Sequence, residues 1–286
     1  MEHYSLASTT WDQLEIEAIH SVIASGHFTM GPRVKEFEEE FAKFFGAKYA
    51  VMSNSGSSAN LLAFAALHYS SKSPMSQGRS EVIVPAVSWS TTYYPVTQLG
   101  YTLKFVDIDA LTLNMNLQQT IDAIDEKTAA IFAVNLLGNP SHLNELAAAA
   151  ETYGIPLLED NCESMGASVG GKYAGSHGLI GTFSCFFSHH ISTMEGGMVV
   201  TDDEELFHIM LSLRAHGWTR NLPKDNLVCG TKSDDPFEES FRFVLPGYNV
   251  RPLELAAAIE RRERGAARLA GALPGTLAAI DRKSVV

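Results

Sequence analysis

Short apolar runs alternate with stretches of helical periodicity along most of this chain, and no other feature constrains its fold as strongly. Amphipathic stretches such as Ser141–Tyr153 and Asp203–Arg214 lie between most of these runs. Strands separated by helices favour a mostly parallel sheet that is buried on both faces. We therefore predict an α/β three-layer sandwich with roughly seven strands, at 49–52, 82–87, 103–106, 129–136, 155–158, 182–186 and 198–200.

Two helices are expected before the first strand. Thr10 can cap a helix that runs to Ser25, and Gly26 is suited to end it. Pro32 opens the second helix, because proline is favoured in a first helical turn. Its apolar residues recur at helical spacing and are expected in the core: Val34, Phe37, Phe41 and Phe44.

The charge balance excludes several classes of function. The chain has 21 basic and 33 acidic residues and a net charge of −12, which disfavours nucleic acids and anionic membranes as partners. The first ten residues, MEHYSLASTT, have no basic start and no apolar core, so we expect no signal peptide there, and we expect no membrane span because the apolar stretches are too short. Three scattered cysteines indicate free thiols. We expect a cytoplasmic protein without a metal site.

The motif SNSGSSAN, at 53–60, stands between an apolar run and a helical stretch. Its small residues allow backbone N–H groups and hydroxyls to approach an anion, and a helix N-terminus attracts negative charge. An ordinary turn from a strand into a helix has a similar sequence, so both interpretations stay open here.

The motif LLEDNCE, at 157–163, places carboxylates at the end of an apolar run. Ligands of α/β proteins bind at the carboxyl ends of the strands, so Asp160 and Glu163 are candidate site residues. A solvated loop or a helix cap would explain the same residues equally well.

A third motif, at 181–197, contains the adjacent histidines His189 and His190 and ends in two glycines. We predict an extended segment, on which adjacent side chains point in opposite directions, so the two histidines are not expected to share a metal. An isolated histidine is usually structural, but one beside a sheet edge is a candidate acid or base.

The last motifs are RAHGWTR, at 214–220, and LPGYNVRP, at 245–252. Arg220 and Arg251 suit a phosphate or carboxylate, because the guanidinium group binds such groups through two hydrogen bonds. Solvated surface arginines are the alternative.

Taken together and in this order, these segments resemble the sugar aminotransferase-like branch of the fold-type I pyridoxal-phosphate enzymes. The resemblance covers about residues 4–255 and is carried by SGSSAN, VPAVSWSTTYYP, FVDID, NLLGNP, LLEDNCESMGA, GTFSCFFSHHISTMEGGMV, RAHGWTRNLP and LPGYNVRP. It implies an aspartate aminotransferase-like fold, with 1–252 as a large cofactor-binding domain that includes an N-terminal helical segment. Residues 253–286 are then expected to be a truncated or divergent C-terminal helix, at 254–272, and a tail, where this family continues into a small domain.

One position departs from most of that family. The lysine that holds the cofactor covalently would stand six residues before the Glu of EGG, and that position is His189. A histidine there resembles the branch that removes the C3 hydroxyl of 4-keto-6-deoxy sugars. This implies pyridoxal phosphate (PLP) and pyridoxamine phosphate (PMP) bound without a covalent link.

The cysteine count separates two kinds of enzyme within that branch. Three scattered cysteines do not suit the members that act on CDP-sugars with an iron–sulfur cluster. SHHISTMEGG and RAHGWTRNLP resemble the members without a cluster. This implies GDP-4-keto-6-deoxymannose as substrate, glutamate to regenerate PMP, and the synthesis of a 3,6-dideoxysugar such as colitose for lipopolysaccharide O-antigen.

The resemblance also implies a role for each matching residue. His189 is expected to be the catalytic base, and Asp160 to pair with the pyridinium nitrogen of the cofactor. The other expected cofactor contacts are Gly56, Ser57 and Ser184 at the phosphate, Trp89 on the ring face, Glu163 at the phenolic oxygen or a substrate group, and Asn249 at the phosphate in a second subunit. The expected substrate contacts are His216, Arg220 and Arg251. The role of Asn249 implies a homodimer.

Two other functions stay open. An ordinary sugar aminotransferase is disfavoured, because the loop that contains His189 has no lysine. A catalytically inactive, cofactor-binding fragment is favoured by the Arg/Ala-rich run at the end of the chain, which replaces the expected small domain. The 3-dehydratase is the function that we predict.

Overall fold

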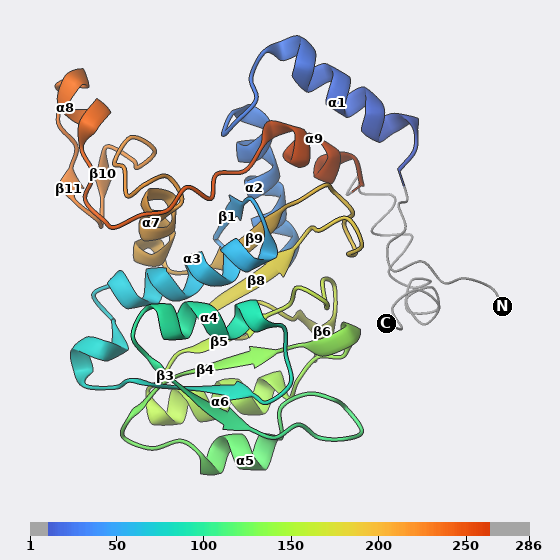
Figure 1. Cartoon of the computed structure of the whole chain (residues 1–286), viewed down its shortest axis with the longest axis vertical. Helices are drawn as coiled ribbons and strands as arrows, with labels where there is room; N and C mark the ends of the chain where they lie inside the picture. The colour runs from blue at the N-terminus through green and yellow to red at the C-terminus, as the bar shows by residue number, and fades with distance from the viewer. Residues whose placement is uncertain (1–10, 264–286) are drawn as a thin grey trace.

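A seven-stranded sheet forms the centre of the computed structural model, which describes residues 11–263 (Figure 1). The sheet has the order β1-β9-β8-β5-β4-β2-β3; β9 is antiparallel to both its neighbours, and every other pair is parallel. Its strands are β1 (Tyr49–Ser53), β2 (Glu81–Pro85), β3 (Thr102–Val106), β4 (Thr128–Val134), β5 (Leu157–Asp160), β8 (Ile180–Ser184) and β9 (Gly197–Thr201). The predicted mostly parallel sheet is confirmed.

The strand at the start of the LLEDNCE motif lies two residues later in the chain than predicted. We expected 155–158, whereas β5 ends at Asp160 and is preceded by Pro156. Proline has no N–H for the hydrogen-bond ladder of a sheet. Glu159 and Asp160 are buried inside the strand, because hydrogen bonds to their carboxylates offset the cost of burying them.

Both faces of the sheet are buried, as the alternation along β4 shows. Ala130 and Phe132 belong to the core on one face, and Ile131 and Ala133 belong to the core on the other. Successive side chains of a strand point to opposite faces. One continuous apolar run therefore fills both cores, as expected for parallel strands between two helical layers.

Helices cover both faces and complete the three layers (Figure 1). On one face, α3 (Gly56–Tyr69), α4 (Ser90–Gln98) and α7 (Glu204–Leu213) pack into the core. On the other face, α2 (Pro32–Phe45) and α6 (Leu143–Tyr153) do so, and α5 (Leu117–Asp122) packs beside α6. The predicted α/β three-layer sandwich is thus confirmed.

The first and last described helices, α1 (Gln13–Ser25) and α9 (Glu254–Glu263), pack against each other. Asp12 caps α1 by accepting a hydrogen bond from the Leu14 N–H, and Gly26 ends the helix as predicted. The predicted cap, Thr10, lies outside the described residues. So does the part of the predicted helix at 254–272 that follows residue 263.

Short elements complete the fold. They are the 3-10 helices η1 (Pro74–Gln77) and η2 (Leu136–Gly138), the two-stranded pairs β6 (Ser168–Val169) with β7 (Lys172–Tyr173) and β10 (Asp225–Asn226) with β11 (Gly230–Thr231), and α8 (Pro236–Phe241). In Figure 1, α8, β10 and β11 extend outward beyond α7.

Candidate active site

Asp160 is the last residue of β5, which lies in the middle of the sheet between β4 and β8. Its carboxylate accepts three hydrogen bonds. Asn60 Nδ2 and Thr92 Oγ1 donate to Oδ2, both at 2.8 Å, and the Cys162 N–H donates to Oδ1 at 3.1 Å. Because each carboxylate oxygen has two lone pairs, Oδ1 can accept one further N–H.

The first turn of α3 lies against the end of β8. A Cβ on Gly56 would stand 2.5 Å from Ser184 Cβ and 2.9 Å from its Oγ, so only glycine permits this approach. Ser55 caps the helix through its side chain, and the exposed Ser57 donates to Thr91 Oγ1 at 3.0 Å. Hydroxyls beside a helix N-terminus suit a phosphate group. The structure therefore brings together Gly56, Ser57 and Ser184.

Trp89 is the N-cap residue of α4, and its side chain is 72% exposed. The Thr92 N–H donates to the Trp89 carbonyl at 3.1 Å. An exposed indole thus lies one helical turn from a residue that holds Asp160. That placement suits a flat ring bound above the sheet edge, and the role of Trp89 stays a prediction.

The segment that contains His189 is a turn, so the prediction of an extended segment is wrong. The His189 N–H donates to the Phe186 carbonyl at 2.8 Å, and the Phe186 ring meets the imidazole edge-on at 5.7 Å between centroids. The backbone turns here because β8 ends at Ser184 and the chain must return antiparallel as β9. His189 is half-buried, and His190 is exposed.

The electrostatic surroundings of His189 favour the neutral imidazole. Partial burial lowers the pKa of His189 below its ordinary value, and the negative charge of Asp160 opposes that shift. A neutral imidazole on which the charge of Asp160 acts is suited to accept a proton at this edge of the sheet.

Glu163 follows β5 and is half-buried. Burial raises the pKa of its carboxyl, the charge of Asp160 adds to this shift, and a hydrogen bond from the Leu137 N–H opposes it. That hydrogen bond is 3.3 Å long, and Leu137 has the left-handed backbone conformation, with φ of 53°. The loop after β4 therefore holds Glu163 beside Asp160.

Two glycines allow the backbone of the RAHGWTR segment to contact the backbone of the LPGYNVRP segment where the two segments cross. A Cβ on Gly217 would lie 1.7 Å from the Leu245 oxygen, and one on Gly247 would lie 1.9 Å from the Gly217 nitrogen. His216 has a positive φ of 65°, and its N–H donates to the Tyr248 carbonyl at 2.6 Å. This crossing fixes the backbone on which His216 and the residues after Tyr248 lie.

Asn249 and Arg251 lie together just after this crossing. Arg251 Nε donates to Asn249 Oδ1 at 3.0 Å, and the Asn54 N–H donates to the Val250 carbonyl at 3.0 Å. The second contact joins both residues to the loop that precedes Gly56.

Arg220 lies apart from these residues. Its guanidinium group stacks over the Trp218 ring at 5.2 Å, and within residues 11–263 no contact joins it to Asp160.

Two residues that hold Asp160 were given no role in the sequence analysis, although Asn60 ends the SNSGSSAN motif and Thr92 lies in VPAVSWSTTYYP. Both are buried, Asn60 in α3 and Thr92 in α4. Asn60 offered a signal, because it is an amide among the apolar residues of α3. Thr92 offered none, since a threonine in a helix is common on exposed and buried faces alike.

The residues at this edge fit PLP. Oδ1 of Asp160 can accept the N–H of a protonated pyridine, and the first turn of α3, with the exposed Ser57 hydroxyl and Ser184 beside Gly56, suits a phosphate. Among the described residues there is no lysine between β8 and β9 that could hold the cofactor covalently.

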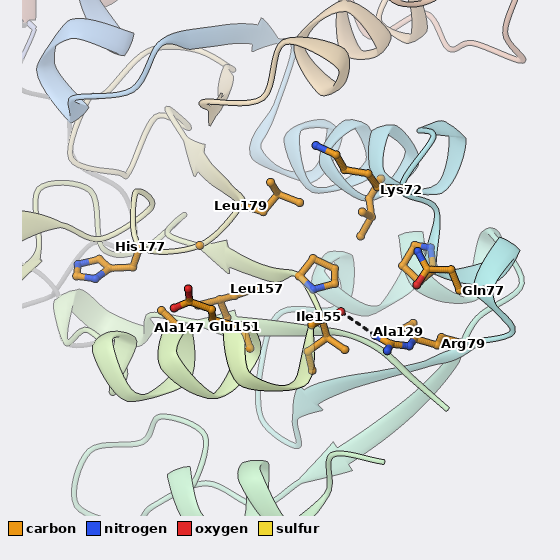
Figure 2. Close-up of a pocket in the computed structure, with 16 residues that line it drawn as sticks. Lys72, Gln77, Arg79, Ala129, Ala147, Glu151, Ile155, Leu157, His177 and Leu179 are labelled. Carbon is orange, nitrogen blue, oxygen red and sulfur yellow. Dashed lines mark hydrogen bonds between the residues drawn. The ribbon is translucent and has the colours of Figure 1, made fainter. Parts of the chain in front are cut away.

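A cavity of about 360 Å³ lies at the opposite edge of the sheet (Figure 2). Ala129 and Leu157, near the starts of β4 and β5, form part of its lining, and Arg79 donates to the Gly154 carbonyl at its rim at 2.8 Å. Since Asp160 ends β5 at the other edge, this cavity is separate from the candidate active site.

Residues 11–263 contain neither a metal-binding cluster nor a membrane-spanning helix. No group of three or more His, Cys, Asp or Glu side chains could hold a metal ion in that range. None of the helices in the same range is both long enough and apolar enough to cross a membrane.

The chain is similar in sequence to known sugar-nucleotide dehydratases. GDP-4-keto-6-deoxy-D-mannose 3-dehydratase of Yersinia pseudotuberculosis is 61% identical over 259 residues, which are 91% of this chain and 66% of that protein. The chain therefore spans slightly less than two thirds of the length of this relative.

Solved structures of similar proteins share the fold. GDP-4-keto-6-deoxy-D-mannose-3-dehydratase of E. coli with bound hydrated PLP matches with a TM-score of 0.90 and 57% identity, over 97% of this chain and 70% of that one. A histidine-to-asparagine variant of such a dehydratase with bound GDP-perosamine matches with a TM-score of 0.89 and 57% identity, over 96% and 70%.

The family itself is established by a match over most of the chain. The model of the DegT/DnrJ/EryC1/StrS aminotransferase family matches residues 9–265. This range includes every candidate site residue described above, so the resemblance recognised in the sequence is confirmed. The chain belongs to the DegT/DnrJ/EryC1/StrS aminotransferase family.

Proposed function

We propose that this chain is the catalytic core of a PLP-dependent dehydratase that removes the C3 hydroxyl of GDP-4-keto-6-deoxymannose. One observation carries the proposal: His189, which by the family resemblance stands where the cofactor-binding lysine is expected, lies in a half-buried turn close enough to Asp160 for that carboxylate's charge to act on it. The Yersinia pseudotuberculosis relative is named for this substrate and reaction, and the two solved structures contain hydrated PLP and GDP-perosamine.

Several residues would hold the cofactor. Asp160 would accept the pyridinium N–H through Oδ1, while Gly56, Ser57 and Ser184 would bind the phosphate. Trp89 would cover one face of the ring, and Glu163 would contact the phenolic oxygen or a substrate group. When bound as PMP, the cofactor supplies an amine for the C4 ketone and a ring that accepts electrons while the C3 hydroxyl leaves.

His189 would perform the proton transfers. Burial keeps the pKa of His189 below its ordinary value, so its imidazole is neutral and would be free to take a proton from the C4′ carbon of the cofactor at a ring nitrogen. The charged imidazole would then donate that proton to the oxygen of the departing C3 hydroxyl, which leaves as water. Since the residue is not a lysine, it cannot hold the cofactor covalently, and this disfavours an ordinary aminotransferase.

The substrate contacts and the assembly are further parts of this proposal. His216, Arg220 and Arg251 would contact the nucleotide sugar, and glutamate would regenerate PMP. Asn249 would serve the cofactor of a second subunit, so that the enzyme would be a homodimer of the cytoplasm. The domain division at residue 252 rests on the family resemblance alone. The part of α9 that the structure describes begins at Glu254 and packs against α1 and α2.

One assay separates the candidate functions. The protein is incubated with GDP-4-keto-6-deoxymannose, glutamate and PLP, and the products are analysed for ammonia and a 3-deoxy sugar. Both products together support the dehydratase. An amino sugar without ammonia would indicate an aminotransferase, and no turnover with intact PLP binding would indicate an inactive fragment.

A further inference from the structure

A buried hydrogen-bond network lies behind Asp160, and the proposed function assigns no role to it. Asn60 and Thr92 both donate to the same oxygen, Oδ2, at 2.8 Å. They come from different helices, α3 and α4, and lie 100 and 68 residues from Asp160 in sequence. Two helices therefore deliver their polar groups to one carboxylate oxygen.

Each donor is itself held in place. Thr182 Oγ1 donates to Asn60 Oδ1 at 2.6 Å, which leaves the Asn60 amide nitrogen to face Asp160. Ser88 Oγ lies 2.9 Å from Thr92 Oγ1, so that hydroxyl can accept from Ser88 while it donates to Asp160. This arrangement gives every polar group in the network a defined direction.

The residues of this hydrogen-bond network are shielded from solvent. Asn60 is 1% exposed, and Thr92 and Thr182 are completely buried. Burying an amide or hydroxyl is unfavourable unless it makes hydrogen bonds, and an apolar residue would fill the same space without that need. The polar residues are therefore best explained by the carboxylate that they contact.

We propose that Asn60 and Thr92 are positioning residues that set the rotation of the Asp160 carboxylate. With Oδ2 engaged by both donors, the carboxylate turns Oδ1 outward, where it accepts the N–H of a protonated cofactor ring. The pair acts on the cofactor only through Asp160. This inference rests on the proposed function in one respect, namely that PLP binds at this edge of the sheet.

The test uses substitutions that remove one donor and keep the shape. Thr92→Val deletes the hydroxyl, Thr92→Ser retains it, and Asn60→Leu deletes the amide while Thr182 can still donate to the Glu159 carbonyl, 3.3 Å away. Thr97→Val is the matched control, because Thr97 is exposed on the same helix and its hydroxyl donates to the Tyr94 carbonyl of that helix at 3.1 Å. Each full-length variant is titrated with PLP.

Three measurements are made on each variant: the PLP dissociation constant, the pH dependence of the visible spectrum of bound PLP, and the melting temperature without PLP. The spectrum reports the protonation of the ring nitrogen, which a purely structural role would not change. We expect Thr92→Val and Asn60→Leu to weaken PLP binding about tenfold or more and to shift the spectral titration to lower pH. Thr92→Ser and Thr97→Val should resemble the unmodified protein.

Lower melting temperatures with an unchanged spectral titration would overturn the positioning role and leave the proposed function intact. The converse result is also distinguishable: a protein that binds PLP with the expected variant effects but does not dehydrate the sugar contradicts only the proposed function. If the unmodified protein does not bind PLP, both proposals fail. Thr92→Val keeps the side-chain shape, so the test does not depend on whether Asn60→Leu folds.

Discussion

The carboxylate of Glu254 accepts a hydrogen bond from the backbone N–H of Val34, 220 residues earlier in the chain, at 2.9 Å. The same carboxylate accepts from the Gly31 N–H at 2.8 Å and the Arg33 N–H at 2.9 Å. The first residue of α9 therefore caps the N-terminus of α2, where the N–H groups have no partner within the helix. Glu254 is 1% exposed, so this contact lies in the core.

Replacing Glu254 by alanine is expected to destabilise the protein by about 3 kcal/mol or more, because three buried or half-buried N–H groups lose a charged acceptor. Glu254→Gln should cost less, since the amide oxygen still accepts. Urea unfolding of each variant measures the change. Glu17→Ala, at an exposed position of α1, is the control, and equal stability of Glu254→Ala and Glu17→Ala would contradict the capping role.

Replacing Gly56 by alanine is expected to weaken PLP binding by about tenfold or more, because the added Cβ would overlap Ser184 and displace the first turn of α3. A fluorescence titration with PLP measures the effect. Gly26→Ala is the control: its backbone is strained by a positive φ, but nothing lies within 4 Å of the added Cβ. That variant should lose stability and keep its affinity for PLP.

Replacing His189 by asparagine is expected to slow dehydration by at least about 100-fold while cofactor and sugar still bind. Steady-state rates and binding titrations separate the two effects. His190→Asn, at the exposed neighbouring position, is the control. If His190→Asn abolished dehydration and His189→Asn did not, the assignment of the base to His189 would be wrong.

The pH dependence of dehydration should reflect the lowered pKa of His189. A base must be neutral to accept a proton, so the rate should be constant near neutral pH and fall as the pH drops through that pKa. The fall should lie below the value of about 6.5 that is ordinary for histidine. An apparent pKa clearly above that value in the rate profile would contradict the influence of burial.

Borohydride treatment with PLP, followed by mass spectrometry, should leave the unmodified protein without a covalent label, because no lysine occupies the anchoring position. His189→Lys should acquire one label and shift the reaction toward transamination. A labelled lysine in the unmodified protein would contradict non-covalent binding. Unlabelled His189→Lys would show that residue 189 does not reach the cofactor.

The sequence by itself determined the layers of this protein and the edge at which its site lies. Periodicity of apolar residues is a local property, and it correctly predicted the seven strands and the helices between them. The carboxyl ends of parallel strands meet at one edge, so the order of strand and motif was sufficient to place Asp160 there, whereas Ser184 was expected at the site only from the family resemblance.

Only the tertiary structure decided which groups contact Asp160 and how His189 is held. Asn60 and Thr92 reach the carboxylate from 100 and 68 residues away, and the Glu254 cap spans 220 residues. No local pattern encodes such pairs, because a buried polar group is stable only with its partner, and that partner arrives when the helices pack on the sheet. The turn at His189 has the same origin: the pairing of β8 with β9, rather than the residues between them, bends the chain there.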